Sequence, residues 1–127
     1  MDVVKRTLAA ARKHPAHEII DAVAMIGGVS RDLAGRILRD PGGEPFAVLC
    51  KSLGLPRGDF FAYFDDPAAD AEARAQGEYL LSFFDVMARD FARAVVRYWD
   101  WDGNPRISHI TNLRGLMEDE IGAPGAF

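Results

Sequence analysis

Residues 27–40 read GGVSRDLAGRILRD, and this stretch decides the fold. Two glycines allow a helix to end in the left-handed backbone conformation, and Ser30 is suited to cap the next helix by accepting a backbone N–H. Leu33, Ile37 and Leu38 then recur at helical spacing until an Asp-Pro pair stops the pattern. The stretch therefore predicts a tight turn followed by a helix.

Two further helices are expected before this turn. Residues 2–13 place apolar side chains on one face and are followed by Pro15, which cannot continue a helix. Residues 17–26 carry isoleucine and valine at helical spacing and run into the two glycines. The second of these helices and the one after the turn form a helical hairpin.

The segment after this hairpin repeats it at an offset of 26 residues. Pro56 replaces Ser30 in the second copy, and proline suits the start of a helix because the N–H that it lacks would have no partner there. Two such hairpins stacked together bury faces that neither buries alone. The matched pairs are Glu18 with Glu44, Gly28 with Gly54, Val29 with Leu55, Arg31 with Arg57 and Asp40 with Asp66.

A different pattern follows the repeats. Residues 68–99 lack proline and carry an apolar stripe, which predicts one long amphipathic helix with a kink near Gly77. A short C-terminal helix is expected over residues 107–121, and no run alternates long enough to predict a strand. We therefore predict an all-α fold. In it, two tandem hairpins over residues 17–66, HEAT-like or helix-turn-helix-like, pack against the long helix within a single domain, residues 1–127.

Composition restricts the classes of function. The chain has 127 residues, 49% of them hydrophobic, with a formal net charge of -4 and an isoelectric point near 5.3. This charge gives no overall attraction to nucleic acid or to an anionic membrane. No apolar run is long enough for a membrane span or a signal peptide, and the single cysteine forms no intrachain disulfide. We expect a cytoplasmic protein.

Residues 26–64 carry a family resemblance. They read IGGVSRDLAGRILRDPGGEPFAVLCKSLGLPRGDFFAYF, with two Gly-aliphatic-Ser/Pro turns and an Asp-x-Gly-Gly linker between them. This segment resembles the C-terminal part of an alphaproteobacterial helical family known as domain of unknown function twenty-three thirty-six. The resemblance implies a helical fold. It brings no activity, cofactor or catalytic residue.

Residues suited to catalysis or metal binding are scattered. His14 and His17 flank a proline and so share no rigid face, and Cys50 lies in an apolar stretch without a neighbouring histidine. The Asp-Trp-Asp-Gly-Asn run that begins at Asp100 lacks the register of a calcium loop. We therefore predict no catalytic, cofactor-binding or metal-binding residue, and no enzymatic activity.

The first hairpin also fits a DNA-binding helix-turn-helix, whose second helix would present three arginines to the major groove. The corresponding face of the second copy is acidic and would repel a phosphate backbone. A helix-turn-helix transcriptional regulator is therefore the alternative function. Its DNA-contacting residues would be Arg31, Arg36 and Arg39.

Aromatic and basic residues near the end of the long helix favour an interaction module. Asp85, Arg89, Arg93 and Arg97 follow one another at four-residue steps, which predicts one intrahelical Asp–Arg pair and a short basic ladder. The rings nearby cover more than one helix face, so some should line a pocket or meet another chain. We predict a non-catalytic protein-protein interaction or regulatory module whose partner is another protein or a second copy. A small apolar ligand is a weaker option. The predicted contact residues are Phe83, Phe84, Arg89, Arg93, Trp99 and Trp101.

Overall fold

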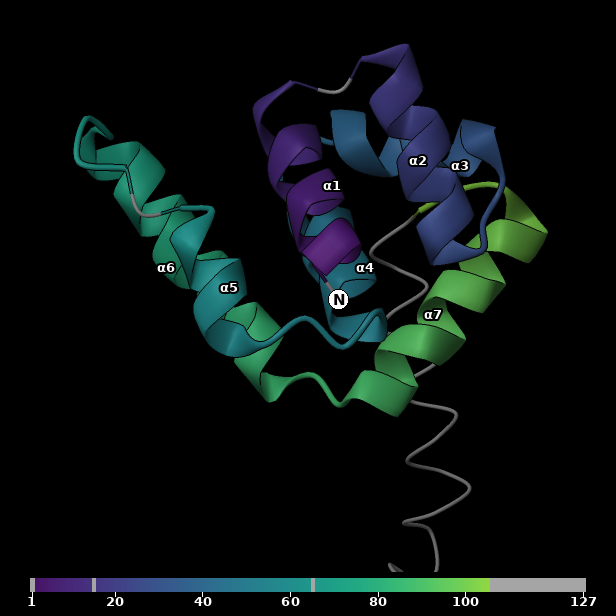
Figure 1. The fold of residues 1–127 in the computed structure, drawn as a ribbon. Helices are drawn as coiled ribbons and strands as arrows, with labels where there is room; N and C mark the ends of the chain where they lie inside the picture. Colours follow the sequence, from purple (N-terminus) through teal and green to yellow (C-terminus); the bar gives the residue numbers. More distant parts are fainter. Residues whose placement is uncertain (1, 15, 65, 106–127) are drawn as a thin grey trace, which may run out of the picture.

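The computed structural model describes residues 2–14, 16–64 and 66–105, and every regular element in these ranges is a helix (Figure 1). The all-helical class predicted from the sequence is confirmed. The C-terminal helix expected over residues 107–121 lies outside the described residues. The helices are α1 (Asp2–Lys13), α2 (His17–Gly27), α3 (Arg31–Arg39), α4 (Glu44–Ser52), α5 (Arg57–Ala62), α6 (Ala71–Val86) and α7 (Arg89–Asp102).

The two copies of the sequence repeat contain turns of the same backbone geometry. Gly28 ends α2 with a φ of 65°, and Gly54 follows α4 with a φ of 78°. Both angles lie in the left-handed region, which glycine enters without the penalty of a Cβ. Each turn is closed by the same long backbone bond, from Val29 N to Ala24 O and from Leu55 N to Cys50 O, both 3.1 Å.

The helices that follow the two turns begin alike. Ser30 and Pro56 have the same extended backbone, and Ser30 Oγ accepts a hydrogen bond from Leu33 N at 3.1 Å. The first residue of each helix is an arginine that pairs with a carboxylate of another helix. The pairs are Arg31 with Asp21 and Arg57 with Asp85.

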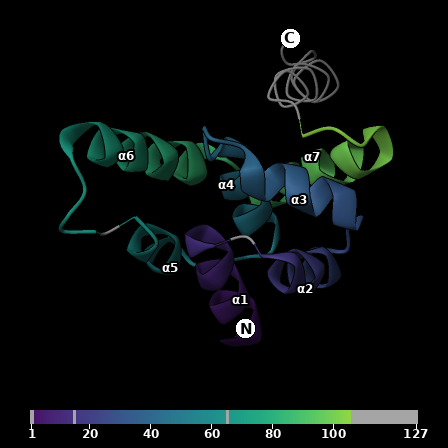
Figure 2. The ribbon, with the colours of Figure 1, turned by 90° about the horizontal axis from the view of Figure 1, so that it is seen from above.

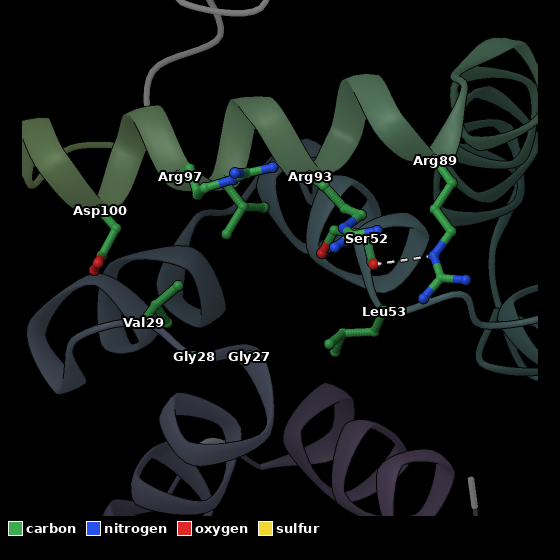
Figure 3. Close-up of a pocket in the computed structure, with 10 residues that line it drawn as sticks. Gly27, Gly28, Val29, Ser52, Leu53, Arg89, Arg93, Arg97 and Asp100 are labelled. Carbon is green, nitrogen blue, oxygen red and sulfur yellow. Dashed lines mark hydrogen bonds between the residues drawn. The ribbon is translucent and has the colours of Figure 1, made fainter.

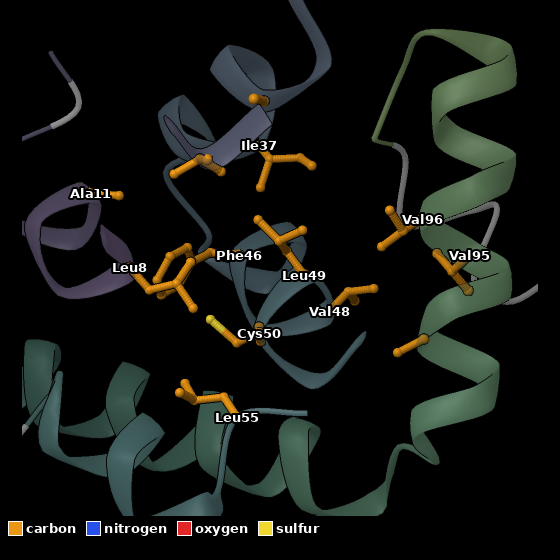
Figure 4. Packing of buried hydrophobic residues seen from close by; sticks show 14 of the residues in the cluster. Leu8, Ala11, Ile37, Phe46, Val48, Leu49, Cys50, Leu55, Val95 and Val96 are labelled. Carbon is orange, nitrogen blue, oxygen red and sulfur yellow. The ribbon is translucent and has the colours of Figure 1, made fainter. Parts of the chain in front are cut away.

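The helix α4 is the centre of the packing. Its residues from Pro45 to Cys50 are all buried, and it contacts α3, α6 and α7. Figure 4 shows Leu8, Ile37 and Val96 arranged around the α4 side chains. In Figure 2, α6, α4, α3 and α7 form one row and α5, α1 and α2 form another. The two units differ in one respect, because α3 packs on α2 whereas α5 packs mainly on α6.

The single long helix predicted over residues 68–99 is wrong. The helix α6 ends at Val86, and α7 begins at Arg89. Met87 between them has an extended backbone, with φ -90° and ψ 128°, and its side chain is only 6% exposed. Neither proline nor glycine marks this break. It lets the chain bury apolar side chains of α6 and then turn so that α7 lies along α4.

The expected kink near Gly77 is also wrong, because Gly77 lies inside the continuous helix α6. A Cβ at this position would lie 3.2 Å from the Cβ of Phe64. This is tighter than most contacts between side chains in proteins. Gly77 therefore allows Phe64, which follows α5, to pack close to α6, and it does not interrupt the helix.

The glycine turns lead to a comparison of three variants. Gly28→Ala and Gly54→Ala should each lower the free energy of unfolding by about 1 kcal/mol, because alanine is strained at positive φ. Gly54→Ala should cost about as much as Gly28→Ala, because the Arg89 guanidinium carbon, 2.9 Å from the new Cβ, ends a flexible side chain that can move aside, and Gly28 has open space. Gly58→Ala is the control, because Gly58 lies in α5 with open space and the change should be neutral or stabilising. Urea unfolding measures all three, and an equal effect at the three sites would contradict this account of the turns.

A tyrosine hydroxyl connects the first helix to the end of α5. Tyr63 donates a hydrogen bond to Lys5 O at 3.1 Å, and burial raises the pKa of Tyr63 to about 12 from its usual 10.0. A raised pKa in the folded state means that this contribution to stability is fully present below pH 10.0. It is lost as the pH rises towards about 12.

The stability of the wild type should therefore fall more steeply over this alkaline range than that of Tyr63→Phe, which cannot ionise at this position. Chemical denaturation at a series of pH values measures the difference. Parallel pH profiles for the two proteins would show that the Tyr63 hydroxyl contributes nothing.

Candidate functional site

A groove of about 330 Å³ runs between α7 and the C-terminal ends of two other helices (Figure 3). Arginine side chains of α7 form one wall, and the turn after α2 and the end of α4 form the other. The groove has both charged side chains and exposed backbone, which are the groups that orient polar ligands. Its lining residues are Gly27, Gly28, Val29, Ser52, Leu53, Arg89, Arg93, Val96, Arg97 and Asp100.

The helical repeat of α7 places the arginines in this groove. Arg89, Arg93 and Arg97 follow at four-residue steps and so share one side of the helix. The neighbouring side of α7 buries its apolar residues in the core, where α7 packs on α4. This packing brings the arginines to the ends of α2 and α4, as Figure 3 shows.

The first arginine is held by the turn of the second repeat. Arg89 Nε donates a hydrogen bond to Ser52 O at 3.3 Å, near the C-terminal end of α4. Carbonyl groups at a helix C-terminus carry partial negative charge and attract a cation. The Arg89 guanidinium also lies over Gly54, where a Cβ would approach its atoms to 2.9 Å. The missing side chain of Gly54 thus makes room for Arg89.

The other two arginines of the groove, Arg93 and Arg97, have exposed side chains. Within the part of the chain that the structure describes, neither they nor Arg89 forms an ion pair. The intrahelical pair predicted between Asp85 and Arg89 is wrong. The break after Val86 separates these two residues, and Asp85 pairs with Arg57 at 2.9 Å instead. The groove therefore concentrates positive charge in a chain that is acidic overall.

The far end of the groove carries the opposite charge. Asp100 Oδ1 accepts a hydrogen bond from Ser30 N at 2.9 Å. Since Ser30 is the N-cap residue of α3, this bond joins α7 to the first repeat turn. Along α7, the charged side chains that line the groove are thus three arginines followed by one carboxylate.

Two of the predicted contact residues are wrong, because they lie in the core. Phe84 is 1% exposed, and its ring stacks on Phe60 with 4.4 Å between the centroids. Lys51 Nζ lies 4.3 Å from the centroid of the Phe84 ring. Trp99 is 0% exposed. Phe84 and Trp99 both belong to the sides of α6 and α7 that pack into the core.

The remaining predicted contact residues lie in three places. Arg89 and Arg93 line the groove, together with Arg97, which the predicted set omits. Trp101 is 82% exposed at the end of α7. Phe83 is half-buried on α6, and its ring stacks on that of Tyr79 with 6.1 Å between the centroids. It is not among the residues that line the groove. The four-residue spacing from Arg89 and Arg93 indicates that Arg97 lies on the same side of α7.

The arginines of the DNA-binding alternative have contacts within the protein. Arg31 pairs with Asp21 and contacts His17 Nδ1 at 2.9 Å, and Arg36 pairs with Asp32 at 3.0 Å. Arg39 folds back over α3, where a Cβ at Gly35 would lie 2.9 Å from a guanidinium nitrogen. All three side chains are exposed. Ion pairing of the first two reduces the positive charge that this face offers to a phosphate.

Nucleophile and metal chemistry find little support in the described residues. No group of three or more His, Cys, Asp or Glu side chains there could hold a metal ion. Cys50 is fully buried in α4, and burial raises the pKa of its thiol well above the usual value. The thiol therefore stays protonated and is a weak nucleophile. No helix of the described ranges has both the length and the apolar character required to cross a bilayer.

The fold and the groove define a small all-helical protein built on a repeated helix-turn-helix unit. Residues 5–97 match the model of a family described as "Uncharacterised protein conserved in bacteria (DUF2336)", and the chain belongs to this family. The family resemblance seen in the repeats is thereby confirmed, and the match extends from α1 into α7. No curated protein and no solved structure matches the chain.

The bond between Asp100 and Ser30 gives a direct test of how the groove is built. Asp100→Ala should lower the free energy of unfolding by about 1 kcal/mol, because Ser30 N then loses its acceptor. Asp100→Asn keeps an oxygen at the same place and should lose much less. Thermal denaturation of both variants measures the difference, and equal stability of Asp100→Ala and the wild type would remove this bond from the account.

Proposed function

We propose that this chain is a non-catalytic interaction module that binds another protein through the α7 groove. One observation carries the proposal. Three arginines line a single groove, and none of them has an ion-pair partner among the described residues. Like charges held close together are unfavourable, and an acidic partner surface relieves this repulsion.

An exposed ring near the groove supports the same proposal. Trp101 lies one residue after Asp100, and its indole contacts Tyr98 with ring centroids 5.9 Å apart. Tryptophan and arginine are the residue types that most often dominate the energy of protein interfaces. A partner that covers the groove could therefore extend onto Trp101.

The helix-turn-helix alternative has weaker support. Arg31 and Arg36 of α3 are paired with carboxylates. In the second repeat, α5 takes the place of α3, and it carries an acidic residue, Asp59, which pairs with Lys5 at 3.1 Å. A DNA-binding surface needs several arginines or lysines that can reach phosphates together. We also propose that the protein is cytoplasmic. Its single cysteine is a buried free thiol, which is typical of a reducing compartment.

Charge reversal tests the proposed function. Arg93→Glu should abolish partner binding, because the central cation of the groove becomes an anion. Arg6→Glu is the matched control, since Arg6 is an exposed arginine of α1 outside the groove and the net charge changes equally. The measurement is capture of bacterial proteins by the three purified chains after nuclease treatment, together with their sedimentation velocity.

We expect a captured protein, or a dimer if the partner is a second copy, in the wild type and in Arg6→Glu but not in Arg93→Glu. Equal capture by all three chains would contradict a role for the groove. Salt-sensitive binding of duplex DNA that is lost in Arg36→Ala would favour the helix-turn-helix alternative.

A further inference from the structure

The arginines of the groove form a regular row. Successive arginines of α7 are separated by about 6 Å along the helix axis, because each helical residue rises 1.5 Å. In an extended peptide, side chains on one face recur every second residue, at about 6.6 Å. Three carboxylates at alternate positions of an extended segment therefore match Arg89, Arg93 and Arg97 within the reach of these long side chains.

The size of the groove separates an extended segment from a helix. An acidic helix could also repeat its carboxylates every 6 Å or so, but with side chains it is about 10–12 Å across. A stretch of it long enough to meet three arginines fills roughly 1000 Å³. The groove holds about 330 Å³, so such a helix would rest on its rim, whereas the side chains of an extended segment can enter it.

Asp100 limits the length of the acidic run. Its carboxylate is fixed at one end of the groove by the hydrogen bond from Ser30 N. A fourth acidic side chain there would face a like charge, whereas a lysine would face an opposite one. The groove thus favours three acidic positions with a basic one at the Asp100 end.

The lining of the groove also bears on nucleic acid, the other common polyanion. Single-stranded nucleic acid binds to proteins through basic grooves in which bases stack on aromatic side chains. Among residues 2–14, 16–64 and 66–105, those that line this groove include no aromatic ring. The arginines can therefore pair with charges, while the exposed ring of Trp101 lies outside the groove lining, where it cannot stack on a base held between the arginines.

We infer that the groove binds a short extended segment of another protein that carries carboxylates at three alternate positions. This inference rests on the proposed function and names the chemistry of its partner. The backbone at the C-terminal ends of α2 and α4 forms the wall opposite the arginines. The carboxylates of the segment therefore face the guanidinium groups, and its backbone N–H groups face the helix-end carbonyls, which carry partial negative charge.

Two synthetic peptides of identical composition test the spacing. In one, three glutamates alternate with glycine or serine and are followed by lysine. In the other, the three glutamates are consecutive. Fluorescence anisotropy should show that the wild type binds the alternating peptide at least about fivefold more tightly than the consecutive one. Arg93→Glu should weaken binding of the alternating peptide about tenfold or more, and Arg6→Glu should leave it unchanged.

Circular dichroism of each variant, recorded under the same conditions, verifies that the helices are intact. Equal affinity for the two peptides would overturn the inference, because charge alone would then account for binding. Tighter binding of an oligothymidylate of the same charge would overturn it in favour of nucleic acid.

Failure of the folded wild type to bind either peptide would also overturn the inference. The proposed function would survive that result if protein capture still depended on Arg93, since the partner would then present a different acidic surface. Loss of both the capture and the peptide binding would remove both proposals.

Discussion

The burial of α4 is the constraint on which the rest of the structure depends. All six residues from Pro45 to Cys50 are buried, so this helix has no side that is left for water. A short helix of this kind gains its stability from the helices packed around it. The helix α7 is its main neighbour, and it reaches α4 only because the chain breaks at Met87 and changes direction. The packing of α4 thus determines where the arginines of α7 lie.

The repeat turns and the groove are connected through the same contacts. Gly54 adopts a positive φ to end the α4 unit, and the space left by its missing side chain is filled by the guanidinium of Arg89. At the other end, Asp100 accepts the N–H of Ser30, the residue that begins α3 after the first turn. Each repeat turn therefore receives one end of the charged row on α7.

The sequence predicts those parts of the fold that local chemistry determines. The glycines at 28 and 54, the cap at Ser30 and the proline at 56 each act within a few residues, so their roles could be deduced from the sequence and are confirmed. The break at Met87 has no such local cause, since neither glycine nor proline lies nearby. It follows from packing between distant segments, and the sequence pattern alone indicates one continuous helix.

The candidate site also has one part that the sequence predicts and another that it does not. Four-residue spacing identifies the arginines of α7 as a row, because neighbours on one helix face depend only on the helical repeat. The spacing does not show which side of α7 meets the core. For that reason the sequence predicts Phe84 and Trp99 as contact residues although both lie buried, and it does not indicate the pairing of Asp85 with Arg57.

The carbon chemical shifts of the backbone around Met87 show directly whether α6 and α7 are separate helices. We expect helical shifts from Ala71 to Val86, extended values at Met87 and Ala88, and helical shifts again from Arg89 to Asp102. An uninterrupted series of helical shifts from Ala71 to Asp102 would contradict this expectation, because α7 could then not turn back along α4 and the groove would not form.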